Sequence, residues 1–267
     1  MFIEYLDRHY KCPASTRNIV AHMRQFLTLA GASTEEVYHP RVKRALDALD
    51  RTSTYIPQPR LPVPLKIFKE AILAIPDTME GSLIRAAVLT LFHGAMRRTE
   101  LCPPSVSTFD PRIHLTRADV TLHKDGVTIK IRHAKNAQRY DQSQTRQLAK
   151  SPEAMLCPWA ALAAAVVLVP THHPKEPMLM FPDRNPVTAP YVAEHWGKAL
   201  LKIKAPTGFH RLHSLRKAAA DTAFQKGATI EQVQNFGGWR SDAVWAYVQK
   251  KASKQISKTI VNAITKL

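Results

Sequence analysis

The sequence predicts a mainly α-helical protein that also contains a small antiparallel β-hairpin or sheet. Apolar residues recur every three or four positions along most of the chain, which is the period of a helix with one buried face. The pair Asp125-Gly126 instead separates two alternating, β-branched runs, which is the pattern of a β-hairpin. Residues 52–64 lose this periodicity and carry prolines at 57, 59, 62 and 64, so we expect an extended linker between two domains.

Residues 1–51 are expected to form a small helical domain. Ser15 or Thr16 is suited to cap a helix that ends at Gly31. The apolar face of that helix consists of Ile19, Val20, Met23, Phe26, Leu27 and Ala30. Ser33 and Glu36 have the spacing of a second capping box. A further helix then has Val42, Ala45, Leu46 and Leu49 on one face.

Residues 65–250 are expected to form the second domain, and residues 251–267 a C-terminal helix or tail. Its first two helices are expected at 65–75 and 82–94, and the second leads into Arg97 and ends near Pro103-Pro104. The hairpin strands are expected at 118–123 and 127–133, with a polar third strand near 144–148. Further helices are expected from Cys157 to Val169 and at 189–203.

The segment from Phe209 to Gln249 gathers the side chains that a phosphate site requires. His213 and Arg216 are three residues apart, so on a helix they project from the same face. Trp239 follows a Gly237-Gly238 turn, and Tyr247 stands eight residues further on, in a helix that Ser241 or Asp242 would cap. An imidazole, a guanidinium, an indole N–H and a phenol are together suited to surround one anionic group.

Two turn signals divide this segment into short helices. Gly227 suits the left-handed position that follows a helix end. Thr229 and Gln232 then have the spacing of a capping box, which marks a new helix start. We therefore expect the segment to fold as short helices joined by tight turns.

The charge of the chain favours a polyanionic partner. Lys and Arg number 38 against 21 acidic residues, which gives a formal net charge of +17. An excess of this size is typical of proteins that bind nucleic acid, although a basic protein without such a partner remains the alternative. The basic residues are spread along the chain, which favours a folded basic surface over a disordered arm.

Other features indicate a protein of a reducing compartment. Cys12, Cys102 and Cys157 are far apart and form neither a disulfide framework nor a zinc motif. The first residues are interrupted by charge, unlike a signal peptide, and no apolar run reaches the length of a membrane span. We expect a soluble protein of the cytoplasm, or of the nucleus in a eukaryotic host.

Three motifs together resemble the signatures of the tyrosine recombinases, the phage-integrase family. The C-terminal motif is His213-x-x-Arg216, then Gly238-Trp239, then Tyr247. The upstream arginine motif reads Gly94-Ala-Met-Arg97-Arg-Thr-Glu100-Leu101, and Lys135 follows the second hairpin strand. The resemblance implies the DNA breaking-rejoining fold, with a catalytic domain at 65–250 and a core-binding domain at 1–51 that is shorter than usual and in which the usual first helix is trimmed.

The resemblance also implies a role for each residue in strand cleavage. Arg97 and Arg216 would bind the phosphate oxygens, and Tyr247 would form a covalent 3′-phosphotyrosyl bond to DNA. His213 would accept the tyrosine proton or hydrogen-bond to the phosphate, and Lys135 would protonate the leaving 5′-oxygen. Trp239 would donate its N–H to a phosphate oxygen and pack against the helix that carries the tyrosine. Neither a metal ion nor another cofactor is expected.

The expected partner is double-stranded DNA, bound by a homotetramer that holds two duplexes. The apolar stripe of the tail either folds back on its own domain or docks into a neighbouring protomer. Two alternatives keep the fold but change the function: a DNA-binding protein that has lost its chemistry, and a type IB topoisomerase. Among the site residues, Arg98 and His210 are the alternatives to Arg97 and His213.

Overall fold

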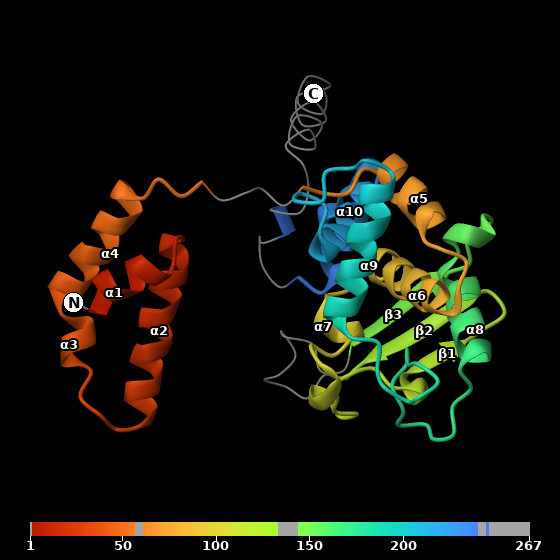
Figure 1. Cartoon of the computed structure of the whole chain (residues 1–267), viewed down its shortest axis with the longest axis horizontal. Helices are drawn as coiled ribbons and strands as arrows, with labels where there is room; N and C mark the ends of the chain where they lie inside the picture. Colours follow the sequence, from red (N-terminus) through yellow and green to blue (C-terminus); the bar gives the residue numbers. More distant parts are fainter. Residues whose placement is uncertain (1, 57–60, 133–143, 240–243, 246–267) are drawn as a thin grey trace, which may run out of the picture. The chain divides into compact units, whose positions relative to one another are not determined.

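The computed structural model describes residues 2–56, 61–132, 144–239 and 244–245 (Figure 1). The chain divides into two compact units, Met1–Pro59 and Arg60–Leu267. Together they are mostly helical, with one small antiparallel sheet in the larger unit, which is the predicted fold class. No helix in the described ranges is long and apolar enough to cross a membrane.

The smaller unit consists of four helices around a small apolar core. They are α1 (Phe2–His9), α2 (Pro13–Leu29), α3 (Glu35–Tyr38) and α4 (Pro40–Thr52). Leu6, Val20 and Leu46 bring one buried side chain each from α1, α2 and α4. Arg17 on α2 also donates to Asp47 and Asp50 on α4, at 2.8 and 2.5 Å.

The helix starts in this unit differ from the prediction. Helix α2 begins at Pro13, before Ser15 and Thr16, because proline has no N–H to leave unsatisfied in the first helical turn. The predicted capping box of Ser33 and Glu36 is also absent, since the Ser33 hydroxyl accepts from Glu35 N instead, at 3.4 Å. The sequence did not predict α1.

The larger unit holds seven α-helices among its described residues. They are α5 (Leu65–Ala74), α6 (Met79–His93), α7 (Arg98–Leu101), α8 (Pro158–Leu168), α9 (Ala189–Lys202), α10 (Leu212–Gln225) and α11 (Ile230–Gly237). Helix α6 is the centre of the core: Leu83, Ile84 and all seven residues from Ala86 to Phe92 are buried. It packs against α8, α9 and α10. Short 3-10 turns lie at Val106–Thr108, Arg117–Asp119 and Ala154–Leu156.

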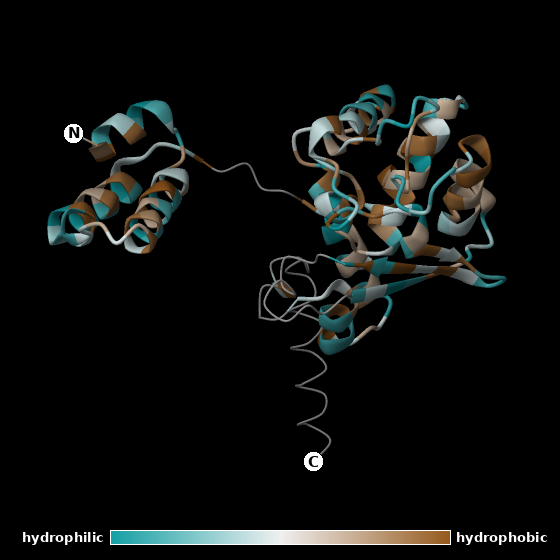
Figure 2. Ribbon diagram, turned by 90° about the horizontal axis from the view of Figure 1, so that it is seen from below, coloured by the Kyte–Doolittle hydropathy of each residue, from teal (hydrophilic) through white to brown (hydrophobic). Residues whose placement is uncertain are grey.

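The sheet has three antiparallel strands in the order β1 (Val120–Leu122), β2 (Gly126–Ile131) and β3 (Gln144–Ala149), so the third strand is confirmed. On one face, Val127, Ile129 and Leu148 are buried in the core, and helix α8 packs against β2 and β3. Figure 2 shows apolar residues both on these strands and on the helices that lie over them. The other face carries exposed side chains such as Thr121, Lys130 and Gln147.

The arginine motif lies at a break between two helices, and not inside one helix as the sequence suggested. Helix α6 ends at His93, and Ala95 has a left-handed backbone with φ of 44°. Arg97 then caps the short helix α7, and the Glu100 side chain accepts from the Arg97 backbone N–H at 2.7 Å. The left-handed residue turns the chain because a continuous helix requires negative φ at every position.

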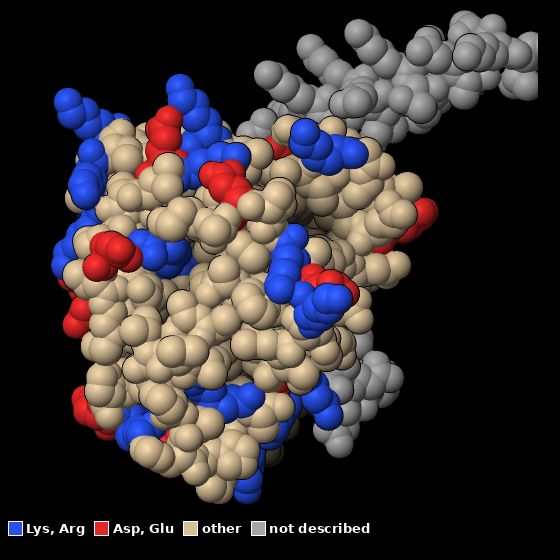
Figure 3. Space-filling view, turned by 90° about the vertical axis from the view of Figure 1, so that its right-hand side faces the viewer, with Lys and Arg blue, Asp and Glu red and all other residues tan. Residues whose placement is uncertain are grey.

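The charged surface is mixed on the face shown in Figure 3. Lys and Arg side chains are scattered over this face, with Asp and Glu side chains among them. Several acidic side chains pair with basic ones, as in Lys69–Glu153 at 3.0 Å and Lys198–Glu194 at 2.7 Å. This face of the larger unit therefore carries charges of both signs.

Candidate functional site

Arg216 is the most deeply buried charged side chain of the site. It lies on α10 and is 0% exposed. Its Nη1 donates to the carbonyl oxygen of Ala95, just after α6, and its Nη2 donates to that of Gly237, at the end of α11, at 2.8 Å. These two bonds fix the plane of the guanidinium, and they join three segments that are far apart in the sequence.

Trp239 supports this arginine from one side. The Arg216 Cζ lies 4.1 Å from the centre of the indole ring, a cation–π geometry. The ring folds back onto Gly237, where a Cβ would collide with it, so only glycine fits there. Trp239 is buried in a small cluster with Ala95, Ala220, Val233 and Val244.

Arg97 is held by an ion pair with Glu100. Its Nη1 donates to Glu100 Oε1 at 2.6 Å, and the two side chains are 21% and 3% exposed. The neighbouring Arg98 is exposed, so the geometry favours Arg97 over Arg98 as the site residue. Arg97 stands two residues after Ala95, whose carbonyl accepts from Arg216, so Arg216 contacts the turn after α6 from which Arg97 extends.

A third arginine, Arg146, lies in the same region, and the sequence analysis missed it. Arg146 is on β3 and is 4% exposed. Its Nη2 donates to Gln144 Oε1 at 2.9 Å, and it lies against Gly238, where a Cβ would be 3.1 Å from Nη2. Burial lowers the pKa of Arg146, attraction by Glu100 opposes this, and repulsion by Arg97 adds to it. Arg146 is therefore close enough to Arg97 and Glu100 to feel their charges.

These three residues, Arg97, Arg146 and Arg216, are called the arginine cluster below. Arg97 pairs with the buried carboxylate of Glu100, which also attracts Arg146, and Arg216 donates to neutral carbonyls. The cluster thus concentrates positive charge in a partly dehydrated region. Guanidinium groups in such a setting are suited to bind the oxygens of a phosphate.

Of the other predicted site residues, the structure describes His213 and its alternative His210. His213 lies in the first turn of α10, one helical turn before Arg216, and is half-buried. Its alternative, His210, is 4% exposed; burial lowers the pKa of His210, and a hydrogen bond to the backbone of Leu61 opposes the shift. The His210 carbonyl also accepts from Trp196 at 2.8 Å, so this residue anchors the core. Lys135 and Tyr247 lie outside the described residues.

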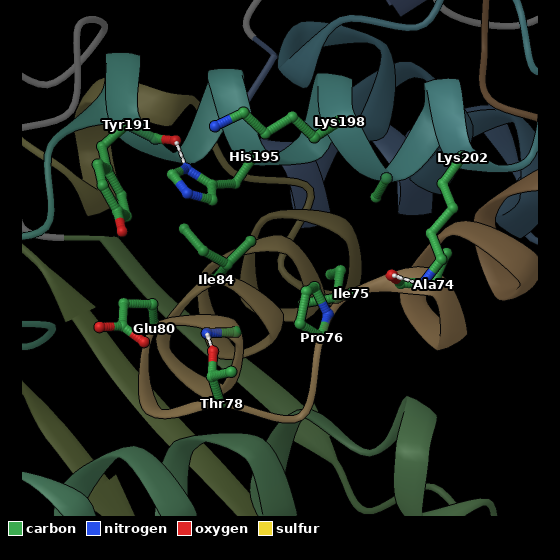
Figure 4. A pocket seen from close by; sticks show the side chains of 12 residues that line it. Ala74, Ile75, Pro76, Thr78, Glu80, Ile84, Tyr191, His195, Lys198 and Lys202 are labelled. Atoms are coloured by element: carbon green, nitrogen blue, oxygen red, sulfur yellow. Dashed lines mark hydrogen bonds between the residues drawn. The ribbon is translucent and has the colours of Figure 1, made fainter.

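A separate pocket of about 330 Å³ lies between the N-terminal end of α6 and α9 (Figure 4). Apolar side chains such as Ile75, Pro76 and Ile84 line it, with Lys198 and Lys202 from α9. Both lysines already have partners, Glu194 for Lys198 and the carbonyl of Ala74 for Lys202. The pocket shares no residue with the arginine cluster.

Comparison of the structure with solved ones identifies the fold. XerA recombinase is 18% identical to the chain; the match covers 97% of this chain and 95% of that one, with a TM-score of 0.52. XerH site-specific recombinase bound to palindromic difH substrate is 14% identical, over 90% and 71%, with a TM-score of 0.55. The Tn1549 transposon integrase in complex with transposon right end DNA is 12% identical, over 91% and 84%, with a TM-score of 0.57.

The chain therefore has the fold of the tyrosine recombinases and integrases, as its motifs predicted. No protein-family model and no curated protein sequence matches it. At this level of identity the likeness extends to the fold, and the chemistry has to be argued from the residues of the site.

Proposed function

We propose that the chain is a site-specific DNA recombinase, or integrase, that cuts and rejoins double-stranded DNA. The reaction would be a transesterification through a covalent 3′-phosphotyrosyl intermediate at Tyr247. The fold and the net charge of +17 support a DNA partner. The chemistry is supported by the residues that meet at the turn after α6.

The observation that carries this proposal is the convergence of Arg97 and Arg216. They lie far apart in the sequence, yet the Arg216 guanidinium bonds to the carbonyl of Ala95, two residues before Arg97. In the proposed complex, the two guanidinium groups would bind the non-bridging oxygens of a single phosphate. Negative charge that develops on those oxygens in the transition state would then be stabilised by preorganised donors.

In the proposed first step, the Tyr247 oxygen attacks the phosphorus and forms a new P–O bond, while the bond to the 5′-oxygen breaks. A phenol has a pKa of about 10, so it is mostly protonated at neutral pH. Nearby arginine charges favour the phenolate, and His213 accepts the proton or hydrogen-bonds to the phosphate. Tyr247 would thus act as a nucleophile activated by its surroundings.

Lys135 would supply the proton that the leaving 5′-oxygen takes up. An ammonium group is a suitable general acid because its pKa responds to its surroundings. Trp239 would donate its N–H to a phosphate oxygen. The energy of the broken phosphodiester would remain in the protein–DNA ester, so attack by another 5′-hydroxyl would reseal the strand without a metal ion or ATP.

In this proposal the protein acts as a homotetramer on two duplexes. Residues 1–51 and residues 65–250 of each protomer would both bind the duplex. Residues 251–267 would dock into a neighbouring protomer. The expected compartment is the cytoplasm, or the nucleus in a eukaryotic host.

The direct test is trapping of the covalent intermediate. Incubation with a nicked suicide substrate should give a protein–DNA adduct that resists SDS, persists in EDTA and vanishes in Tyr247→Phe. Tyr191→Phe is a matched control, because this phenol lines the separate pocket. DNA binding without any adduct would favour the alternative of a catalytically inactive DNA-binding protein of the same fold. Relaxation of supercoils without sequence preference would favour the topoisomerase.

A further inference from the structure

Arg146 is a charged residue on the face of the sheet that packs on the core, where its neighbours other than Gln144 are apolar. Side chains on a strand alternate between the two faces, and Arg146 shares its face with Leu148. Across the ladder it pairs with Ile129, which is fully buried. A hydrophobic residue at this position would pack against the core equally well, so the fold alone does not explain the guanidinium.

The contacts of Arg146 leave its charge poorly compensated. Its described hydrogen bonds go to neutral oxygens, Gln144 Oε1 at 2.9 Å and the Thr145 carbonyl at 3.4 Å. Its Nε is buried without a hydrogen-bond partner among the described residues. The nearest compensating charge, Glu100, already holds Arg97. Buried cations in such a setting are costly, and they are retained at sites that use the charge.

Arg146 also packs on the turn that carries Trp239. A Cβ on Gly238 would lie 2.6 Å from Gln144 Oε1 and 3.1 Å from Arg146 Nη2. Arg216 contacts the same turn, because it bonds to Gly237 and lies over the Trp239 ring. The two arginines, one from β3 and one from α10, therefore both contact this turn.

We propose that Arg146 is a positioning residue of the phosphate site, which fixes the Gly238–Trp239 turn and adds a third positive charge beside Arg97 and Arg216. This inference rests on the proposed function for the identity of the substrate. The proposed ligand is a phosphate group, because the cluster has three guanidinium groups and Glu100 is the acidic side chain described beside Arg97 and Arg146. Arg146 acts through the turn, so its loss should reduce cleavage more than it reduces DNA binding.

The first experiment needs no DNA. The unfolding midpoint is measured with and without inorganic phosphate at constant ionic strength for the wild type, Arg146→Gln and Arg146→Lys. Phosphate should stabilise the wild type, and the shift should fall by more than half in Arg146→Gln but by less than half in Arg146→Lys, which keeps the charge. Arg112→Met, which removes an 87% exposed guanidinium, should retain the wild-type shift.

Three results would overturn the proposal: no phosphate shift in the wild type, a full shift in Arg146→Gln, or an equal loss in Arg112→Met. If Arg146→Gln does not fold, Arg146→Met is the neutral variant that suits the apolar surroundings.

The second experiment compares cleavage with binding. In single-turnover reactions on the suicide substrate, Arg146→Gln should cleave about tenfold more slowly, with a change in DNA dissociation constant below about threefold. A loss of affinity that accounts for the whole loss of cleavage would overturn the positioning role. If the wild type forms no adduct at all, the proposed function fails, while the phosphate experiment still decides whether Arg146 serves an anion site.

Discussion

Arg216 shows how one side chain can serve both the site and the fold. A buried guanidinium is stabilised only when its N–H groups meet acceptors, and Arg216 meets the carbonyls of Ala95 and Gly237. Those carbonyls belong to the ends of helices, where the backbone has acceptors that no helical N–H reaches. The arginine therefore supplies hydrogen-bond donors to these two carbonyls, and the same bonds hold its side chain in place.

Glu100 offers a test of the ion pair at residue scale. Glu100→Gln removes the carboxylate that pairs with Arg97, and it should lower the free energy of unfolding by about 1–3 kcal/mol. Urea denaturation measures the change. Glu70→Gln is the matched control, because Glu70 is 47% exposed and only 4.0 Å from Lys66, and it should change stability by less than about 0.5 kcal/mol. Equal effects of both substitutions would contradict a role for burial.

The sequence identified part of the arginine cluster. Arg97 and Arg216 stand in motifs, so the resemblance points to them. Arg146 belongs to none of the recombinase motifs, and a polar strand such as 144–148 gives little sign of which face is buried. The available signal was alternation, because Arg146 shares the parity of Leu148 and therefore its face. That signal becomes readable only when the pairing of β3 with β2 is known.

At the scale of elements, the turn Gly237-Gly238 connects α11 to the site. Gly238 ends α11 in the left-handed conformation, with φ of 68°. The same residue leaves room for Gln144 and Arg146 from β3. One turn thus meets a backbone requirement and a packing requirement at once, and both favour glycine.

Gly238→Ala should therefore be destabilising. The left-handed backbone and the contact with Gln144 together should cost about 1–3 kcal/mol in thermal or urea unfolding. Gly197→Ala is the control: Gly197 lies inside α9, its added Cβ would meet nothing within 4 Å, and the variant should be more stable by about 0.5–1 kcal/mol. Gly238→Ala with unchanged stability would show that the turn can rearrange.

Local signals in the sequence predicted some elements well and others poorly. The capping box of Thr229 and Gln232 forms at the start of α11, and Gly227 has a positive φ of 100°, both as predicted. Helix α7 was hidden inside what resembled one continuous helix, because Ala95 gives no sequence sign of its left-handed backbone. Tertiary contact with Arg216 stabilises that conformation, and such contacts are not visible in a local pattern.

At the scale of the whole molecule, stability should depend on pH through a partly buried histidine. Burial lowers the pKa of His93 below its ordinary value of 6.5, against the effect of a hydrogen bond to the backbone of Leu156. The unfolded chain therefore takes up the proton first, so this stability is present above pH 6.5 and is lost as the pH falls toward the lowered pKa.

The free energy of unfolding should accordingly fall as the pH is lowered from 7 through the region just below 6.5, and His93→Gln should reduce that slope. The exposed His22→Gln serves as control and should leave the slope unchanged. A slope that is identical in all three proteins would exclude His93 as its source.

The bonds of Arg216 to Ala95 and Gly237 have a consequence for how such proteins diverge. A lineage that no longer cleaves DNA can lose its nucleophilic tyrosine with little effect on stability. Loss of this arginine would instead leave two buried carbonyls without hydrogen-bond donors. We therefore expect degenerate descendants to retain the buried arginine long after they stop reacting with DNA. In such descendants the arginine would be retained for its structural role, and the nucleophilic tyrosine would be the better indicator of an active enzyme.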